Sequence, residues 1–180
     1  MSQETRRRSY RYVGPAELRG AVRADSSGAA IRTAADLDMW IRARPPEERT
    51  EPFTYVVDAA GTLRLAPRRS EHVACAGGGR VLGAGEIGFV REAGGWAADE
   101  VSNQSTGYCP DVTSWPAVAR ALDGAGIARP DRFTYEVVFR RCPACDEPAI
   151  VRDGDFSCVF CGGDLPGEWN VDPGGIRRIP

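Results

Sequence analysis

Lysine is absent from this chain of 180 residues, so that all 23 basic side chains are arginine. Schiff-base chemistry on a lysine and a phosphate-binding loop with its lysine are therefore both excluded. Histidine is almost absent as well, because His72 is the one example. This excludes zinc hydrolases of the H-E-x-x-H type and any other site that needs two imidazoles.

Long apolar runs are missing too. No run reaches the about 18–20 residues that a membrane span needs. The N-terminal stretch 1–11 is rich in arginine and has no apolar segment behind it, so we expect neither a secretory signal nor membrane contact. The expected compartment is the cytoplasm, where cysteines stay reduced and bind metals more often than they form disulfides. The length fits one domain, alone or with a small appendage.

Four of the six cysteines form two C-x-x-C pairs near the C-terminal end of the chain. Cys142 and Cys145 make the first pair, Cys158 and Cys161 make the second, and twelve residues separate the pairs. Two such pairs present four thiolates to one small ion, and this spacing is typical of a tetrahedral zinc site. Iron also suits four thiolates, and free or redox-active thiols are the remaining alternative.

The segment that holds these cysteines resembles a zinc ribbon over residues 138–170. A strand is predicted at 149–152 and a turn at 153–155, and Gly162-Gly163 lets the second pair turn sharply. The resemblance implies zinc as cofactor and a closed coordination shell, which stabilises a fold but leaves no position for a substrate. Ribbons serve as nucleic-acid contacts, protein contacts or structural staples.

Charge favours protein over nucleic acid as the partner of this ribbon. Residues 140–180 carry five arginines and seven acidic residues, whereas phosphate binding depends on an excess of basic side chains. Trp169, Phe160 and Leu165 would suit a protein partner, and they could equally dock the ribbon onto the rest of the chain.

The remainder of the sequence predicts an α+β fold. Helices are expected near Pro15, after the capping-box pattern Thr33-x-x-Asp36, and from Ser114 onward, which makes about three. The expected strands, forming a small and mostly antiparallel sheet, lie at 53–57, 62–65, 73–75, 80–82, 86–90, 96–101 and 132–140.

These elements divide the chain into three parts. We expect a disordered basic tail over residues 1–12, an α+β domain over 13–137, and the zinc ribbon with a C-terminal tail over 138–180. Because the last predicted strand leads straight into Cys142, the ribbon is expected to pack on the main domain.

Residues 68–111 hold the other concentration of chemical groups. Their blocks resemble uncharacterised bacterial proteins, and this resemblance implies no function. The pattern Gly83-x-Gly85-x-x-Gly88 matches a dinucleotide-binding motif, but the predicted strand continues after it where that motif needs a helix. Glycine turns between short strands are the favoured interpretation.

Two chemical hypotheses involve His72. In the first, His72, Cys75 and Cys109 bind a second zinc with an open fourth position, and Glu71 or Glu86 handles protons. The simpler alternative is a pair of buried thiols and a hydrogen-bonded histidine.

In the second hypothesis, His72 activates Cys109 or Ser105 as a nucleophile, oriented by Asn103 or an acid. The alternative is a loop whose polar side chains cap the neighbouring backbone.

Three functions follow from these patterns. The leading one is a non-catalytic intracellular binding or regulatory protein that holds one structural zinc and contacts another protein. The second is a hydrolase or transferase that uses the region of His72, Ser105 and Cys109. The third is nucleic-acid binding through Arg6-Arg7-Arg8 with Tyr10 and Tyr12. The alternative for this segment is a disordered tail that aids solubility.

Overall fold

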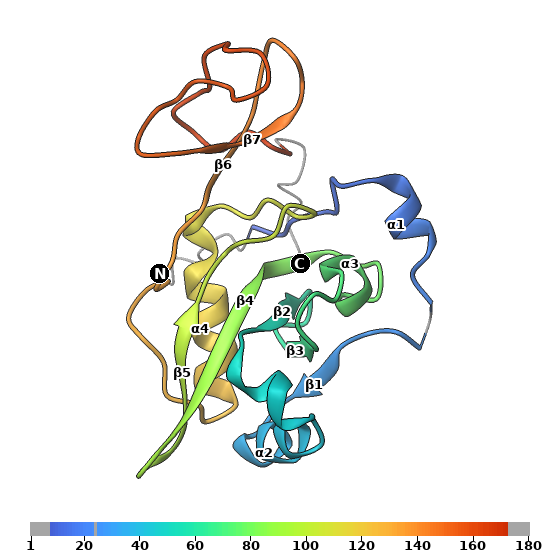
Figure 1. Cartoon of the computed structure of the whole chain (residues 1–180), viewed down its shortest axis with the longest axis vertical. Helices are drawn as coiled ribbons and strands as arrows, with labels where there is room; N and C mark the ends of the chain where they lie inside the picture. The colour runs from blue at the N-terminus through green and yellow to red at the C-terminus, as the bar shows by residue number, and fades with distance from the viewer. Residues whose placement is uncertain (1–7, 24, 173–180) are drawn as a thin grey trace, which may run out of the picture.

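A five-stranded antiparallel sheet forms the centre of the molecule in the computed structural model, which describes residues 8–23 and 25–172 (Figure 1). The strand order is β1-β3-β2-β4-β5, and a separate two-stranded sheet, β6-β7, lies at one end of the molecule. The strands are β1 (Ala29–Ile31), β2 (Phe53–Asp58), β3 (Leu63–Ala66), β4 (Val81–Glu92), β5 (Gly95–Val101), β6 (Val138–Arg141) and β7 (Pro148–Val151). The predicted α+β class is confirmed.

Short helices surround this sheet. The α-helices are α1 (Ala16–Gly20), α2 (Ala34–Arg42), α3 (His72–Cys75) and α4 (Trp115–Gly124), and two 3-10 turns are η1 (Pro46–Thr50) and η2 (Val112–Ser114). No helix among the described residues has the length and apolarity to cross a membrane.

The start of α2 confirms the predicted capping box. The Thr33 hydroxyl accepts a hydrogen bond from the backbone N–H of Asp36, whose carboxylate accepts one from the N–H of Thr33. Two N–H groups that the first helical turn cannot satisfy are thereby paired. Leu37 and Ile41 then bury one face of the helix.

The hairpin of β2 and β3 also follows the prediction. The Asp58 carboxylate accepts hydrogen bonds from the N–H groups of Ala60 and Thr62. Gly61 adopts φ = +86°, a left-handed conformation that glycine reaches without strain. Side chains alternate along β2, so that Tyr55 and Val57 face the larger core while Val56 faces a smaller one.

Gly83, Gly85 and Gly88 do not form turns, and the prediction of separate strands at 80–82 and 86–90 is wrong. A single strand, β4, runs through them. An added Cβ at Gly83 would lie 2.7 Å from Val118 of α4, and one at Gly85 would lie 2.0 Å from the carbonyl oxygen of Ser102. These glycines therefore allow a helix and a loop to approach the strand closely, and no helix follows them as dinucleotide binding requires.

Two further strand predictions are wrong. Residues 73–75 lie in α3, where the N–H of Cys75 bonds to the carbonyl of Glu71, and one helical turn is too short to give a periodic signal. The strand expected over 132–140 begins at Val138. Before it, the chain touches β5 through Thr134, and Tyr135 is 62% exposed instead of sharing the buried face of Phe133.

The N-terminal segment packs against the main domain from Arg8 onward. Tyr10 is 1% exposed and exchanges backbone hydrogen bonds with Val81 at 2.7 and 3.0 Å. The tail expected over residues 1–12 is therefore an ordered part of the fold in its last five residues. Residues 1–7 and 173–180 lie outside the described residues.

Candidate metal centre

The C-terminal part of the molecule is built on the β6-β7 hairpin, and we call residues 138–165 the four-cysteine module. Val138 pairs with Val151 and Arg141 with Pro148, so that β6 delivers the chain directly to Cys142. Figure 1 shows the module projecting from one end of the main domain.

Two similar turns hold the four cysteines. In the first, the N–H of Asp146 bonds to the carbonyl of Cys142, and in the second the N–H of Gly162 bonds to the carbonyl of Cys158. Both closing residues have a left-handed backbone, with φ = +63° at Asp146 and +74° at Gly162. Each turn thus brings its two sulfurs to the same side of the chain.

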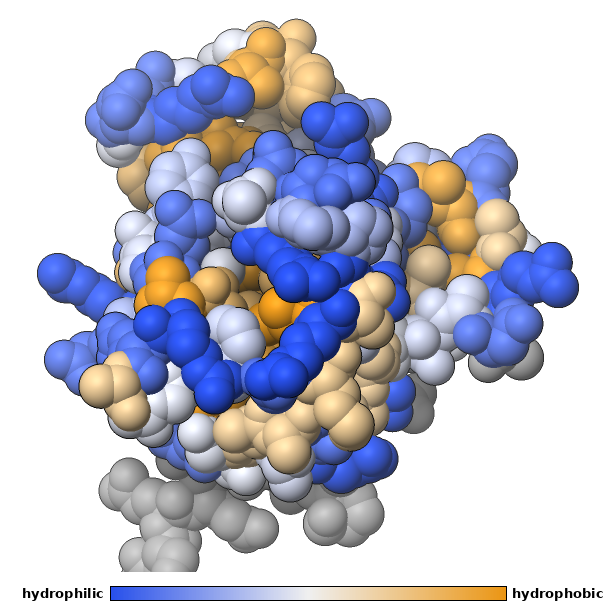
Figure 2. Space-filling model, turned by 60° about the horizontal axis from the view of Figure 1, so that its bottom comes forward, coloured by the Kyte–Doolittle hydropathy of each residue, from blue (hydrophilic) through white to orange (hydrophobic). Residues whose placement is uncertain are grey.

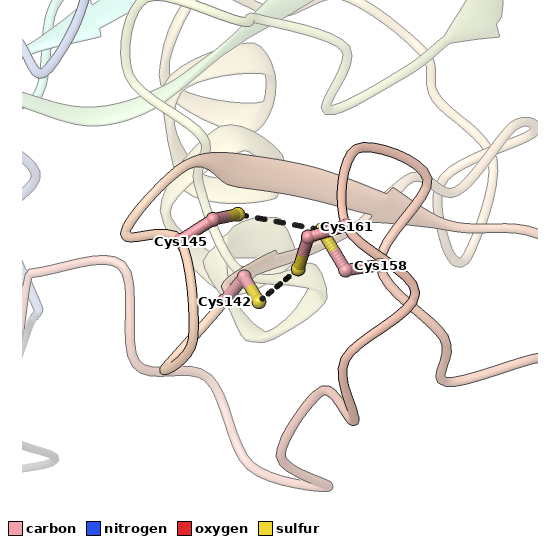
Figure 3. A group of neighbouring side chains, drawn as sticks. All are labelled: Cys142, Cys145, Cys158 and Cys161. Carbon is pink, nitrogen blue, oxygen red and sulfur yellow. Dashed lines mark hydrogen bonds between the residues drawn. The ribbon is translucent and has the colours of Figure 1, made fainter.

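The four sulfurs form one compact group (Figure 3). All lie within 4.8 Å of one another, and the Sγ–Sγ distances are 3.6 Å for Cys142–Cys161 and 3.7 Å for Cys145–Cys158. A tetrahedral ion with metal–sulfur bonds of about 2.3 Å requires sulfur separations of roughly 3.8 Å. The cysteines are therefore positioned to bind a metal ion, and the geometry is consistent with zinc.

The surroundings of Cys142 favour its thiolate form. The backbone amide of Cys145 is the main cause that lowers the pKa of Cys142 to about 7. The backbone amides of Glu147 and Gly163 act in the same direction on Cys145 and Cys161, but hydrogen bonds with the neighbouring thiols leave the pKa of both raised. The N–H of Gly163 donates to the sulfur of Cys161 at 3.4 Å. Cys142 and Cys158 are buried while Cys161 is exposed, so one side of the cluster faces solvent.

The chain on both sides of the module is held to the main domain, by Trp169 after the module and by Asn103, which binds the residue before it. The indole N–H of Trp169 donates to the carbonyl of Cys109 at 2.8 Å, and its ring packs edge-on against Tyr10 at 5.4 Å. Asn103, which is fully buried, binds the backbone of Val137 immediately before β6. Trp169 is therefore a docking residue.

Within the module, Leu165 is buried and Phe160 is 64% exposed. Of the three apolar residues that the sequence analysis offered to a partner, Phe160 alone faces solvent. Its neighbour Val159, which the sequence analysis did not consider, is equally exposed at 63%.

The structure does not assemble a second group of metal ligands in the described part of the chain, where the four-cysteine cluster is the one group of three or more. Cys75 packs in a core with Val56, and Cys109 packs in another with Phe139. Burial raises the pKa of each of these two thiols to about 12, which disfavours the thiolate that a metal or a nucleophilic mechanism needs.

His72 is hydrogen-bonded to the backbone and not to either candidate nucleophile. Its Nε2 lies 2.9 Å from the carbonyl oxygen of Gly85. The Ser105 hydroxyl accepts from the N–H of Tyr108 at 3.3 Å, and the Cys109 sulfur lies 3.2 Å from the carbonyl of Thr106. Among the described residues, these groups satisfy local backbone and form no nucleophile–base pair.

Glu71 and Glu86 are the two acidic residues that the sequence analysis places with His72 to handle protons. Glu71 is exposed and precedes α3. Glu86 lines a shallow hollow of about 360 Å³ together with Glu100 and Tyr135, and His72 does not line it. Burial is the main cause that acts on the pKa of His72, and it lowers this pKa. The charges of Glu86 and Glu71 act in the opposite direction with a smaller effect.

The described part of the arginine tail is engaged within the fold. Arg8 pairs with Asp111 at 2.9 Å and its guanidinium lies 4.8 Å above the ring of Trp169. Tyr12 packs edge-on against Tyr108. Arg6 and Arg7 lie outside the described residues.

No protein-family model, curated protein or solved structure matches this chain. Its function must therefore be argued from its own geometry.

Proposed function

We propose that this chain is a non-catalytic binding protein in which one zinc ion, held by four cysteines, stabilises a ribbon that contacts another protein. Zinc is the preferred ion because it accepts four thiolates in a tetrahedron without redox chemistry, and structural zinc sites with two C-x-x-C pairs use this arrangement. With four protein ligands the shell is closed, so the ion acts on folding and not on a substrate.

The observation that carries the protein contact is the exposure of Val159 and Phe160. They occupy the two positions between Cys158 and Cys161, so a bound ion would fix their backbone from both sides. Phe156, 38% exposed, lies on the same module. Adjacent apolar side chains on a rigid turn form a surface that binding partners use, because little conformational freedom is lost on association.

The charge of the module supports a basic partner surface. Residues 138–165 hold five acidic residues and three arginines, and the five acidic side chains are exposed while Arg140 is buried. Four thiolates with one Zn²⁺ add a further charge of about −2. A protein with an apolar pocket ringed by basic side chains complements this surface, whereas a nucleic acid would be repelled.

Site-specific photocrosslinking in the source cells tests this contact. A benzophenone amino acid in place of Phe160 is compared with the same group in place of Met39, which is 66% exposed on α2. The proposal requires a discrete adduct from position 160 that position 39 does not give, and its loss in a Val159→Asp background that keeps full zinc. Identical adducts from both positions, or none from position 160, would contradict it.

A further inference from the structure

A hollow of about 480 Å³ lies between α2, η1 and the β4-β5 hairpin. Figure 1 shows α2 at the end of the molecule away from the four-cysteine module. Its size falls in the range of about 300–1,000 Å³ that is usual for small-molecule sites. The side chains that line it come from five elements and are Asp38, Ile41, Arg42, Arg49, Phe53, Phe89, Arg91 and Trp96.

The floor of this hollow is apolar and aromatic. Ile41 and Phe53 are buried, and Phe89 and Trp96 are half-buried. The rings of Phe53 and Phe89 lie 6.4 Å apart with an interplanar angle of 33°. This is the spacing of aromatic rings that contact each other, so they form one continuous apolar surface. The half-buried rings of Phe89 and Trp96 leave part of that surface open to a flat apolar group.

The rim of the hollow is cationic. Arg42, Arg49 and Arg91 supply three positive charges and Asp38 supplies one negative charge, a local net charge of +2 on a chain whose formal net charge is −2. Figure 2 shows this face, with a hydrophobic floor inside a ring of strongly hydrophilic side chains.

Existing contacts hold the arginines in place without using all their donors. Asp38 binds Arg42 and Arg91, both at 2.7 Å, and accepts from the indole N–H of Trp96 at 3.2 Å. Arg91 also lies 5.1 Å above the ring of Trp96. Because two guanidiniums neutralise Asp38, this carboxylate does not oppose the binding of an anion.

Arg49 is fixed from the other side. Its Nε and one Nη donate to the carbonyls of Arg44 and Arg42 at 2.8 and 2.9 Å. A guanidinium carries five N–H donors in a planar fork, so each rim arginine keeps N–H donors beyond those that these contacts use. This fork matches the oxygens of a carboxylate or a phosphate.

We propose that this hollow binds a small aromatic anion, with its ring on the Phe53–Phe89–Trp96 floor and its carboxylate or phosphate on the arginine rim. The site is independent of the metal centre and of the partner surface on the module. Its occupant needs both features, because a neutral ring leaves the rim without a counter-charge and a bare anion leaves the floor exposed to water.

Titration with 2-naphthoate, followed by NMR of the tryptophan indole N–H signals, tests the proposal. The chain has four tryptophans, and a Trp96→Phe variant assigns the relevant signal. A saturable shift of the Trp96 signal is expected, with Kd of about 1 mM, the range of a fragment of this size. Neutral 2-naphthamide should bind at least about tenfold more weakly, since it lacks the charge that the rim recognises.

Matched arginine variants separate the site from general charge. Arg91→Gln should weaken 2-naphthoate about tenfold, because one of the rim's three cations is lost. Arg152→Gln, which removes an exposed arginine on the four-cysteine module, should leave the affinity unchanged. No Trp96 shift at about 10 mM ligand, equal binding of the amide, or equal effects of the two variants would each overturn the proposal.

Discussion

The side-chain amide of Asn103 forms two hydrogen bonds with the backbone of Val137. Its Oδ1 accepts from the N–H of Val137 at 2.7 Å, and its Nδ2 donates to the carbonyl of Val137 at 2.7 Å and to that of Pro110 at 3.0 Å. The amide therefore replaces a strand partner for the residue that precedes β6. Asn103 belongs to the loop that the sequence analysis considers as a candidate active site. Through these hydrogen bonds the loop holds the residue that leads into the four-cysteine module.

Asn103→Ala should destabilise the protein by about 3 kcal/mol, because it leaves buried backbone groups without partners. Gln104→Ala is the matched control, since this neighbouring amide side chain is exposed, and it should change stability by less than about 0.5 kcal/mol. Urea denaturation of both variants measures the difference. Equal stabilities of the two variants would show that the hydrogen bonds of Asn103 do not hold Val137 in place.

Gly85→Ala should cost more than about 3 kcal/mol or prevent folding, because the new Cβ would lie 2.0 Å from a backbone oxygen that cannot move freely. Gly124→Ala offers the opposite outcome. This glycine is in α4 with nothing within 4 Å of the added Cβ, so alanine should stabilise the helix by about 0.5–1 kcal/mol. Thermal unfolding compares the two, and a tolerated Gly85→Ala would refute the close approach of the Ser102 loop to β4.

Acid sensitivity should depend partly on His72. Burial lowers the pKa of this imidazole in the folded state below its ordinary value of about 6.5. As the pH falls below 6.5, the unfolded chain binds a proton that the folded chain does not, so stability present above that pH is progressively lost. Well above pH 6.5 the imidazole is neutral in both states and contributes no pH dependence.

A His72→Gln variant removes this titration and keeps a donor for the carbonyl of Gly85. The decline in unfolding temperature between pH 7 and pH 5 should be smaller in the variant than in the native chain. Because acid also releases metal from thiolates, both proteins are compared under the same metal conditions. A steeper decline in the variant would contradict the burial of a neutral His72.

Metal removal should unfold the four-cysteine module and spare the sheet. Hydrogen exchange after treatment with a strong chelator should show lost protection at β6 and β7, because folding of such modules depends on the ion. Protection in β2 and β4 should persist, since these strands belong to the separate core of the main domain. Uniform loss across both sheets, or no loss in the module, would be inconsistent with this division.

Much of the fold follows from local sequence signals. The capping box of α2, the β2-β3 hairpin and the two C-x-x-C turns each rest on residues within about ten positions of one another, and each was predicted. The glycines of β4 were misread because their reason lies in Val118 and Ser102, which are distant in the sequence. Local patterns do not report such contacts.

The candidate sites divide in the same way. Cys142, Cys145, Cys158 and Cys161 come together as their spacing predicted. In the 103–109 loop the side chain of Asn103 binds backbone, and a buried amide of this kind has the same sequence appearance as a reactive group. The arginine-rimmed hollow had no local signal, since its residues come from five separate elements.

The most direct test of the central claim is native mass spectrometry of the purified chain beside its Cys158→Ser variant. One zinc per native chain and none in the variant is the predicted result, with Cys109→Ser, which alters a thiol outside the cluster, retaining the ion. Two metals per chain, iron in place of zinc, or full zinc in the Cys158→Ser variant would contradict the assignment of one structural zinc to the four cysteines.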